Sequence, residues 1–372
     1  MVNLCLSNRR LGLWKWINII LVMVNGFLYV KVTCDQQFTA MYVFGDSLVD
    51  NGNNNFINSY AKANFPPYGI DFYLGPTGRF TNGKTIIDYL CELIGIPYLP
   101  PYASPFVTDR DLMYGVNYAS AAGGILEDSG QGLGERFSFS RQIQNFNNTR
   151  HQLMNHMSDE NLADYLRKAL GVIILGSNDY INNYLNPAYP RSKIRPDKYA
   201  DIVIDYYTKQ VLALYDLGMR RFFLAGVGPL GCTPSQKTVA KLPPGKCLDF
   251  SNDAPQMFNF RLRSLVDKLG ATHRDSIFVF GDTFAAIKDI LDHPLPYGIS
   301  VVDSACCGVG KNNAEKMCLP FLIPCLNRDQ YAFWDAFHPS QAVHRILALK
   351  AYYGPQNVSY PINVQQMAHV KL

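Results

Sequence analysis

The sequence carries little net charge and lacks the common signatures of metal and nucleic-acid binding. Its 372 residues have a formal net charge of +4, and the first 34 carry four basic side chains and no acidic one. The rest of the chain therefore has a formal net charge of zero and no basic block to attract nucleic acid or anionic lipid. It also lacks Cys-x-x-Cys and His-x-x-x-His pairs. We expect no nucleic-acid partner, no metal ion and no cofactor.

The chain also lacks an apolar run suited to a stable membrane span. The N-terminal apolar stretch, residues 16–30, is interrupted by Asn and Gly and is shorter than the ~20 residues that a spanning helix needs. Because basic residues precede it, we predict that residues 1–34 are a secretory signal peptide, cleaved within 32–37, with a signal anchor as the alternative. No linker or repeat divides residues 35–372, which are expected to form one domain of a secreted, extracellular protein.

Cysteine, by contrast, is concentrated in the second half of the chain. Of nine cysteines, six lie there: Cys232, Cys247, Cys306, Cys307, Cys318 and Cys325. In an exported protein this predicts disulfides, whose pairing the sequence leaves open. Cys91 lies in a helical pattern and is expected to be a free buried thiol. Asn147 and Asn357 each begin an Asn-x-Ser/Thr tripeptide and are candidate glycosylation sites.

Apolar runs and helical patterns alternate along the chain. The predicted strands are residues 40–44, 113–119, 170–175, 221–227 and 276–282. The predicted helices between and after them are residues 84–94, 138–155, 159–169, 199–217, 253–269, 284–292 and 341–353. This alternation predicts an α/β fold, a three-layer α/β/α sandwich whose parallel sheet has helices on both faces.

Small polar residues follow three of the predicted strands. Ser47 follows the first strand, Gly123 and Gly124 the second, and Asn178 the third. The carboxyl ends of parallel strands share one edge of a sheet, so we expect these residues to lie near one another. Each has a structural alternative, because such residues also form ordinary turns or allow close packing.

An acidic residue and a histidine near the C-terminus complete a possible catalytic site. Asp335 precedes His338 by three residues, so its carboxylate can orient the imidazole, which in turn can accept the proton of Ser47. The alternative is that both residues cap the following helix. Donors for an oxyanion are expected from the N–H of Ser47, the N–H of Gly123 or Gly124, and the side-chain amide of Asn178.

Four ordered motifs carry a family resemblance. They are Gly45-Asp46-Ser47-Leu48, Asn117-Tyr118-Ala119-Ser120-Ala121-Ala122-Gly123-Gly124, Gly176-Ser177-Asn178-Asp179 and Asp335-Ala336-Phe337-His338-Pro339. Between about residues 42 and 353 the chain resembles the GDSL-type esterases and lipases of the SGNH hydrolase superfamily, in their plant secreted branch. No Gly-x-Ser-x-Gly elbow is present, which disfavours an ordinary α/β-hydrolase.

The resemblance implies a fold and a role for each site residue. The fold would be an SGNH hydrolase fold with a five-stranded parallel sheet in the flavodoxin-like order 2-1-3-4-5. The nucleophile would be Ser47, the base His338 and its partner Asp335. The oxyanion site would be Ser47, Asn178 and Gly123, the last favoured over Gly124.

The sequence therefore predicts a secreted serine esterase or lipase that hydrolyses carboxylic esters through an acyl-enzyme. The substrate would be an ester of a lipid, an acylated carbohydrate or a small metabolite. Two alternatives remain: a deacetylase of cell-wall polysaccharide or small acyl glycosides that uses the same site, and a catalytically idle secreted binding protein. Four aromatic residues either line the substrate cleft or belong to the core: Phe56, Phe65, Tyr68 and Phe80.

Overall fold

The structure, a computed structural model, describes residues 17–23, 26–32 and 37–372. The chain divides into two units, residues 1–37 and Phe38–Leu372. In the first unit, β1 (Ile17–Met23) and β2 (Gly26–Val32) pair as antiparallel strands. Arg9, Arg10 and Lys15 of the predicted signal and most of its cleavage region lie outside the described residues, so the signal peptide stays a prediction. None of the helices in the described ranges has the length and apolar character needed to cross a membrane.

A five-stranded sheet runs through the second unit, in the order β3-β4-β5-β6-β9. Four of its strands are parallel: β3 (Met41–Gly45), β4 (Leu170–Ile174), β5 (Arg221–Ala225) and β6 (Ile277–Gly281). The two-residue β9 (Ser359–Tyr360) pairs antiparallel with β6. In the parallel ladder the last residues of the strands are neighbours, so the carboxyl ends form a single edge.

The predicted second strand lies beside β3 but is not a regular strand. Its backbone oxygens at Tyr114 and Val116 accept the N–H groups of Met41 and Val43, at 3.0 and 3.1 Å. Gly115, between them, has φ +108°, and a Cβ there would lie 1.9 Å from the Met41 oxygen. This left-handed residue interrupts the extended conformation. The predicted order 2-1-3-4-5 is confirmed, with an irregular second segment and the antiparallel β9 as differences from the prediction.

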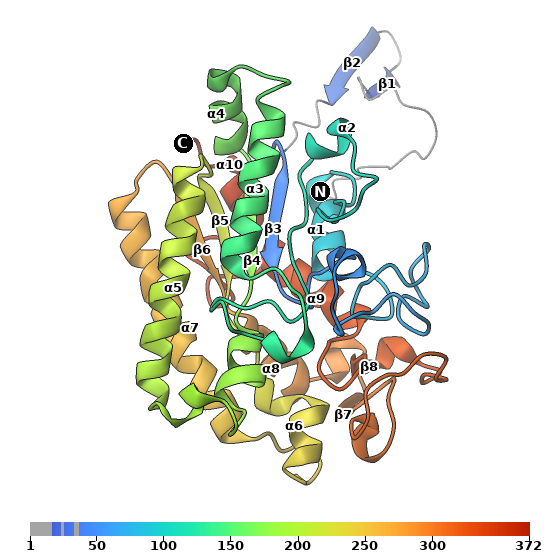
Figure 1. Cartoon of the computed structure of the whole chain (residues 1–372). Helices are drawn as coiled ribbons and strands as arrows, with labels where there is room; N and C mark the ends of the chain where they lie inside the picture. The colour runs from blue at the N-terminus through green and yellow to red at the C-terminus, as the bar shows by residue number, and fades with distance from the viewer. Residues whose placement is uncertain (1–16, 24–25, 33–36) are drawn as a thin grey trace. The chain divides into compact units, whose positions relative to one another are not determined.

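Alternate side chains of each strand enter two separate cores. Tyr42 and Phe44 belong to one apolar cluster, and Met41 and Val43 belong to the other. The first cluster is covered by α3 (Phe139–Leu153), α4 (Asp159–Arg167), α5 (Pro196–Asp216) and α7 (Asp249–Thr272), seen in front of the sheet in Figure 1. The second is covered by α1 (Ile86–Ile94), α8 (Thr283–Asp292), α9 (Gln341–Tyr353) and α10 (Val364–His369). The predicted three-layer α/β/α architecture is confirmed.

Disulfides stabilise the loops beyond the carboxyl edge. They join Cys232 to Cys247, Cys306 to Cys325 and Cys307 to Cys318, as expected for the cysteine-rich half, and Cys91 is buried and free, as predicted. The remaining short elements are α2 (Asp109–Leu112), α6 (Pro234–Val239), β7 (Val301–Ala305) and β8 (Tyr331–Phe333). Strands β7 and β8 are parallel. The cysteine-rich loop, residues 306–330, connects them, and β8 ends two residues before Asp335.

Candidate active site

Ser47 lies in a tight turn directly after β3, at the carboxyl edge of the sheet. The turn is closed by Asp46, whose backbone oxygen accepts the N–H of Asp50 at 2.9 Å and whose Oδ1 accepts the N–H of Leu48 at 3.0 Å. Asp46 is buried, and burial raises the pKa of its carboxyl group to about 7. Ser47 itself is half-buried, so its hydroxyl is presented at the edge of the core.

A buried glutamine holds the residue at the end of β3. Gln142, in α3, accepts the N–H of Gly45 at its Oε1 (2.8 Å) and donates from its Nε2 to the Gly45 oxygen (2.8 Å) and the Phe137 oxygen (2.9 Å). A Cβ at Gly45 would lie 2.3 Å from Val49 Cγ2, so a larger residue would push the turn away. Sequence reasoning missed Gln142, because nothing in a helical pattern marks one polar residue as buried.

The structure brings Ser47, His338 and Asp335 together. The Nε2 of His338 lies 2.8 Å from the Oγ of Ser47, although 291 positions separate the two residues. On the other side of the ring, Nδ1 lies 2.8 Å from both carboxylate oxygens of Asp335. The backbone N–H groups of Phe337 and His338 donate to Asp335 Oδ1, at 2.9 and 2.8 Å. The imidazole therefore has a hydroxyl at one nitrogen and a carboxylate at the other.

The alternative, that Asp335 and His338 cap the following helix, is not what the structure has. Helix α9 begins at Gln341, and its N-cap is Ser340, whose Oγ accepts the N–H of Val343 at 3.4 Å. The Asp335 carboxylate instead closes its own turn, upstream of the helix.

Asp335 has a further partner that the sequence did not indicate. The hydroxyl of Tyr68 donates to Asp335 Oδ2 at 2.6 Å. The Tyr68 ring packs against Trp334 and Phe80, with centroid distances of 6.1 and 6.0 Å, and Phe80 lies 5.0 Å from the His338 ring. Burial opposes ionisation of Asp335, but its histidine and hydrogen-bond donors outweigh this and hold the pKa of Asp335 below its ordinary value.

Gly123 and Asn178 are neighbours, as predicted for two strand ends at one edge. Asn178 precedes a short π-helical turn, Asp179–Tyr184, and its Nδ2 donates to the Gly123 oxygen at 2.9 Å. The Nδ2 of Asn182 donates to Asn178 Oδ1 at 2.7 Å, which fixes the orientation of the amide. The N–H of Gly123 donates to the Ser120 oxygen at 2.9 Å, and no described residue accepts the N–H of Gly124.

Two buried carboxylates hold the backbone around these residues. Asp179 accepts the N–H groups of Ile125 and Leu126, at 2.9 and 2.8 Å. Asp50 accepts the N–H of Ala121 at 2.9 Å. Burial raises the pKa of both Asp50 and Asp179 to about 6. The segment between Ala121 and Leu126 is therefore fastened at both ends, which limits how far a backbone donor there can move.

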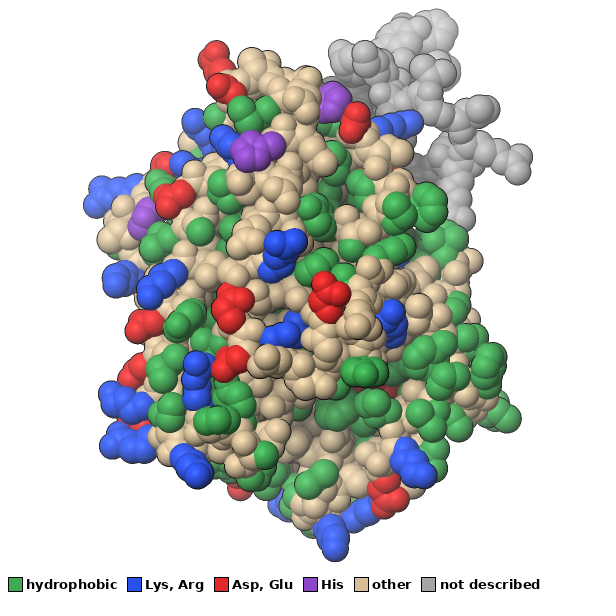
Figure 2. Space-filling view, in the orientation of Figure 1, with side chains coloured by type: hydrophobic (Ala, Val, Ile, Leu, Met, Phe, Trp, Pro, Cys, Tyr) green, Lys and Arg blue, Asp and Glu red, His purple; other side chains and the backbone are tan. Residues whose placement is uncertain are grey.

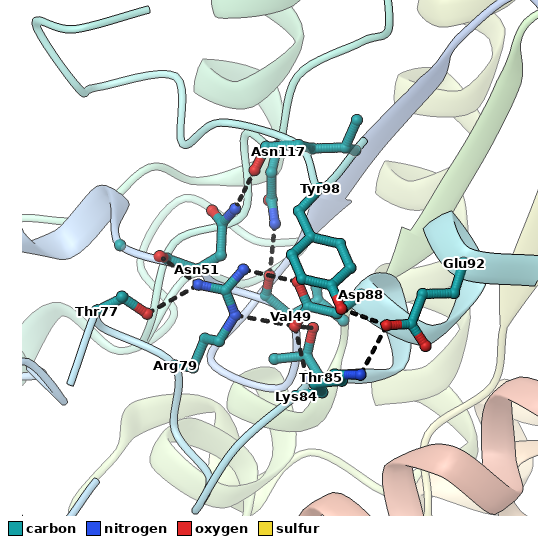
Figure 3. A network of polar contacts seen from close by, with 12 residues as sticks. Val49, Asn51, Thr77, Arg79, Lys84, Thr85, Asp88, Glu92, Tyr98 and Asn117 are labelled. Atoms are coloured by element: carbon teal, nitrogen blue, oxygen red, sulfur yellow. Dashed lines mark hydrogen bonds and ion pairs between the residues drawn. The ribbon is translucent and has the colours of Figure 1, made fainter. Parts of the chain in front are cut away.

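A buried ion pair connects the end of the long loop after Ser47 to α1 (Figure 3). Arg79 donates from Nη2 and Nε to Asp88, at 2.6 and 2.9 Å, and Asp88 also accepts the N–H of Thr85 at 2.7 Å. Asp88 is buried, which opposes ionisation, but Arg79 holds the pKa of its carboxyl group below its ordinary value. Nearby, Asn117 donates to the Val49 oxygen at 2.7 Å, which ties the turn to the irregular second segment.

The four aromatic residues proposed for a cleft have different environments. Tyr68 and Phe80 are buried in a third apolar cluster with Trp334, and Phe65 packs against that cluster. Phe56 is exposed. Tyr68 and Phe80 thus belong to the core next to the site and do not line a cleft, in agreement with the second alternative given for these aromatic residues.

A small apolar cavity lies beside the site. It is lined by residues next to Ser47 and His338 in the chain, Leu48 and Pro339, and by the strand-end residues Ile174 and Ala225. Its volume is about 50 Å³, smaller than the roughly 150 Å³ of a cavity that holds benzene. His344 also lines it; burial lowers the pKa of this histidine to about 3. The cavity is too small to hold a long acyl chain.

The two candidate glycosylation sites differ in exposure. Asn357 is exposed in a turn and Asn147 is half-buried in α3, so glycosylation stays a prediction. Within the described ranges, no cluster of three His, Cys, Asp or Glu side chains could hold a metal ion.

Comparisons with known proteins identify the family. The model of the GDSL-like lipase/acylhydrolase family matches residues 41–351. A GDSL esterase/lipase from Arabidopsis thaliana is 51% identical over 338 residues, covering 90% of this chain and 90% of that protein. Another from the same plant is 46% identical over 376 residues, covering 100% of this chain and 97% of that protein.

Among solved structures, an acetylxylan esterase from Geobacillus stearothermophilus aligns with a TM-score of 0.38 at 15% identity, covering 83% of this chain and 90% of that one. A likeness of this size carries no conclusion by itself. The family model and the plant relatives do, and from them we conclude that this chain belongs to the GDSL-like lipase/acylhydrolase family, whose members are serine hydrolases of ester bonds.

Proposed function

We propose that this protein is a secreted serine esterase or lipase that cleaves carboxylic esters through an acyl-enzyme. Ser47 is the nucleophile, His338 the general base and Asp335 the residue that orients the base. One observation carries the proposal: the 2.8 Å contact between His338 Nε2 and Ser47 Oγ, which is the geometry that a base needs to remove a hydroxyl proton.

In the first half of the reaction, the Ser47 oxygen attacks the ester carbonyl as its proton passes to His338 Nε2. Asp335 accepts a hydrogen bond from the N–H at His338 Nδ1, so the imidazole keeps its proton there and has a free lone pair on Nε2. The imidazolium then gives its proton to the departing alkoxide, and the acyl group remains on Ser47. In the second half, His338 takes a proton from water as the water attacks the acyl-enzyme. The imidazolium then returns that proton to the departing Ser47 oxygen, which releases the carboxylic acid and restores the free serine.

The tetrahedral intermediates need hydrogen-bond donors for their oxyanion. We assign this role to the N–H of Ser47, the amide of Asn178 and the backbone N–H of Gly123, which donates to the Ser120 oxygen in the unliganded site and would have to exchange that acceptor for the oxyanion. In the unliganded site the Asn178 amide donates to the Gly123 oxygen, so the oxyanion takes over a donor that is already oriented. Because loss of one such donor typically costs ~10²–10³ in turnover, we expect that fall in kcat for Asn178→Ala.

Secretion is part of the proposal. Three disulfides lie between Cys232 and Cys325, and disulfides of this kind persist in oxidising compartments. Reduction to six thiols would leave the loops beyond the sheet without their cross-links. A mature N-terminus within residues 32–37, found by mass spectrometry of protein from the culture medium, would support secretion, and a start at Met1 would contradict it.

Labelling with a fluorophosphonate tests the catalytic assignment. We expect a single adduct, mapped to Ser47 by peptide mass spectrometry, and its loss in Ser47→Ala and His338→Ala. Ser264→Ala, at an exposed position of α7, is the matched control and should label like the wild type. Folded protein that labels elsewhere, or does not label, would favour the idle binding protein. Hydrolysis of p-nitrophenyl esters beside acetylated xylan then separates the esterase from the polysaccharide deacetylase.

A further inference from the structure

The cysteine-rich loop exposes an unusual number of large apolar side chains. Between Met317 and Asn327 it has no charged residue. Phe321, Ile323 and Leu326 are 82, 92 and 88% exposed. Exposed apolar side chains are ordinary when they are scattered, but a contiguous group on one loop indicates a surface that contacts something else.

Disulfides anchor both ends of the segment that carries these side chains. Cys318 is bonded to Cys307, and Cys325 to Cys306. Both partners belong to the framework at the end of β7, where the N–H groups of Cys306 and Cys307 donate to the oxygens of Phe333 and Trp334, at 3.0 and 2.8 Å. The segment between the two cross-links is therefore fixed at both ends, with Phe321 and Ile323 exposed.

A second loop that exposes apolar side chains is bonded to the first. It belongs to the long loop after Ser47 and includes Tyr73 and Leu74. The two loops are joined by a bond from the Phe321 N–H to the Pro66 oxygen (2.9 Å) and by a bidentate ion pair of Arg328 with Asp71, at 2.6 and 2.7 Å.

Figure 2 shows hydrophobic side chains gathered at the lower right of the face in view, where Figure 1 places these two loops. We call the following six residues the apolar rim: Tyr73, Leu74, Leu319, Phe321, Ile323 and Leu326.

The apolar rim is connected to the catalytic residues. Pro66, which holds Phe321, precedes Tyr68 by two residues, and Tyr68 donates to Asp335. On the other loop, Cys306 and Cys307 donate backbone hydrogen bonds to Phe333 and Trp334, the two residues directly before Asp335. A surface that engages the rim would thus lie on the loops that carry the site.

We propose that the apolar rim docks this enzyme on the surface of an aggregated, uncharged lipid, so that ester groups are drawn from a lipid phase. This rests on the proposed function and adds the physical state of the substrate. An uncharged partner fits because the loop segment has no charge and the chain beyond residue 34 has a formal net charge of zero. Aliphatic and aromatic side chains on one face are the groups that enter a lipid–water interface.

Vesicle flotation tests the docking without catalysis. Secreted Ser47→Ala protein, purified from the culture medium without the predicted signal peptide, is mixed with dioleoylphosphatidylcholine vesicles, and we expect it to float with them. Replacing Phe321, Ile323 and Leu326 together by Ser should lower the partition coefficient by about tenfold per side chain. The matched control replaces three exposed apolar residues elsewhere, Val239, Phe260 and Leu295, by Ser and should float like the parent. Salt at ~1 M, which screens charges that are more than about 3 Å apart, should change the binding little.

Hydrolysis separates this inference from the proposed function. With Ser47 intact, the rim variant should cleave soluble p-nitrophenyl acetate at the wild-type rate but lose most of its rate on an emulsified long-chain ester. If the parent does not float, the inference is wrong, whatever the rate on the soluble ester. A parent that stays unbound but is a dimer, which the rim substitutions make monomeric, would assign the rim to self-association instead. Flotation without any hydrolysis would refute the proposed function and leave the docking surface.

Discussion

The hydrogen bond from Tyr68 to Asp335 can be removed with little other change, by Tyr68→Phe. The ring stays, so its packing against Trp334 and Phe80 is kept. What is lost is one donor, 2.6 Å from a buried carboxylate oxygen. The remaining donors are two backbone N–H groups on Oδ1 and the imidazole.

The magnitude follows from the kind of bond. A hydrogen bond to a charged group contributes about 1.5–3 kcal/mol, so we expect the free energy of unfolding to fall by about 2 kcal/mol at neutral pH. The interactions that lower the pKa of Asp335 stabilise the folded state above the ordinary carboxyl range and lose that effect as the pH falls. The stability difference between variant and wild type should therefore shrink as the pH drops through ~4.

Catalysis should change in a way that a structural defect alone would not cause. Without the tyrosine donor, the Asp335 carboxylate attracts the imidazolium proton more strongly, so the acidic limb of the kcat/KM profile should move to higher pH. We expect a shift of up to about one pH unit, which corresponds to about 1.4 kcal/mol. The less constrained carboxylate should also lower kcat by about tenfold, with KM nearly unchanged.

The assay is a pH profile on a soluble p-nitrophenyl ester, combined with urea unfolding at several pH values. Tyr297→Phe is the matched control, because Tyr297 also donates to a carboxylate, that of Asp289, away from the site. It should leave the pH profile unchanged. A Tyr68→Phe variant that is less stable but keeps the wild-type profile and kcat would show that Tyr68 only supports the fold, and an unchanged stability would contradict the magnitude given above.

Two further substitutions test how the Ser47 turn is held. Burial raises the pKa of Asp46 to about 7, so this residue favours folding at low pH and the contribution is lost as the pH rises through about 7. Asp46→Asn, measured by urea unfolding at pH values of ~5 and ~8, should flatten that decline; a steeper decline would contradict the sign. Gln142→Leu leaves both backbone groups of Gly45 without their partner, at a cost of about 1–3 kcal/mol for each. Gln142→Glu keeps the acceptor for the Gly45 N–H, and when protonated it also has a donor. Its free energy of unfolding should therefore be closer to that of the wild type at low pH than at neutral pH.

Much of the fold could be predicted because its signals are local. Helix α3 was predicted at 138–155 and runs Phe139–Leu153, since Ser138 is its N-cap. The second strand was predicted from its apolar residues, but Gly115 at φ +108° makes it irregular. Periodicity indicates which residues face a core. It does not indicate the backbone conformation of Gly115, where the Met41 oxygen lies too close to leave room for a Cβ.

The candidate site divides in the same way. Apolar runs that end in small polar residues are a property of the sequence, and parallel strands bring their ends to one edge, so Ser47, Gly123 and Asn178 could be grouped in advance. The contact of Ser47 with His338 across 291 positions depends on how α9 packs on the sheet. The contacts of Tyr68 with Asp335 and of Gln142 with Gly45 likewise depend on how segments far apart in the sequence pack together. These partners are ordinary residues whose chemistry is set by burial and by what lies opposite, and only tertiary packing decides both.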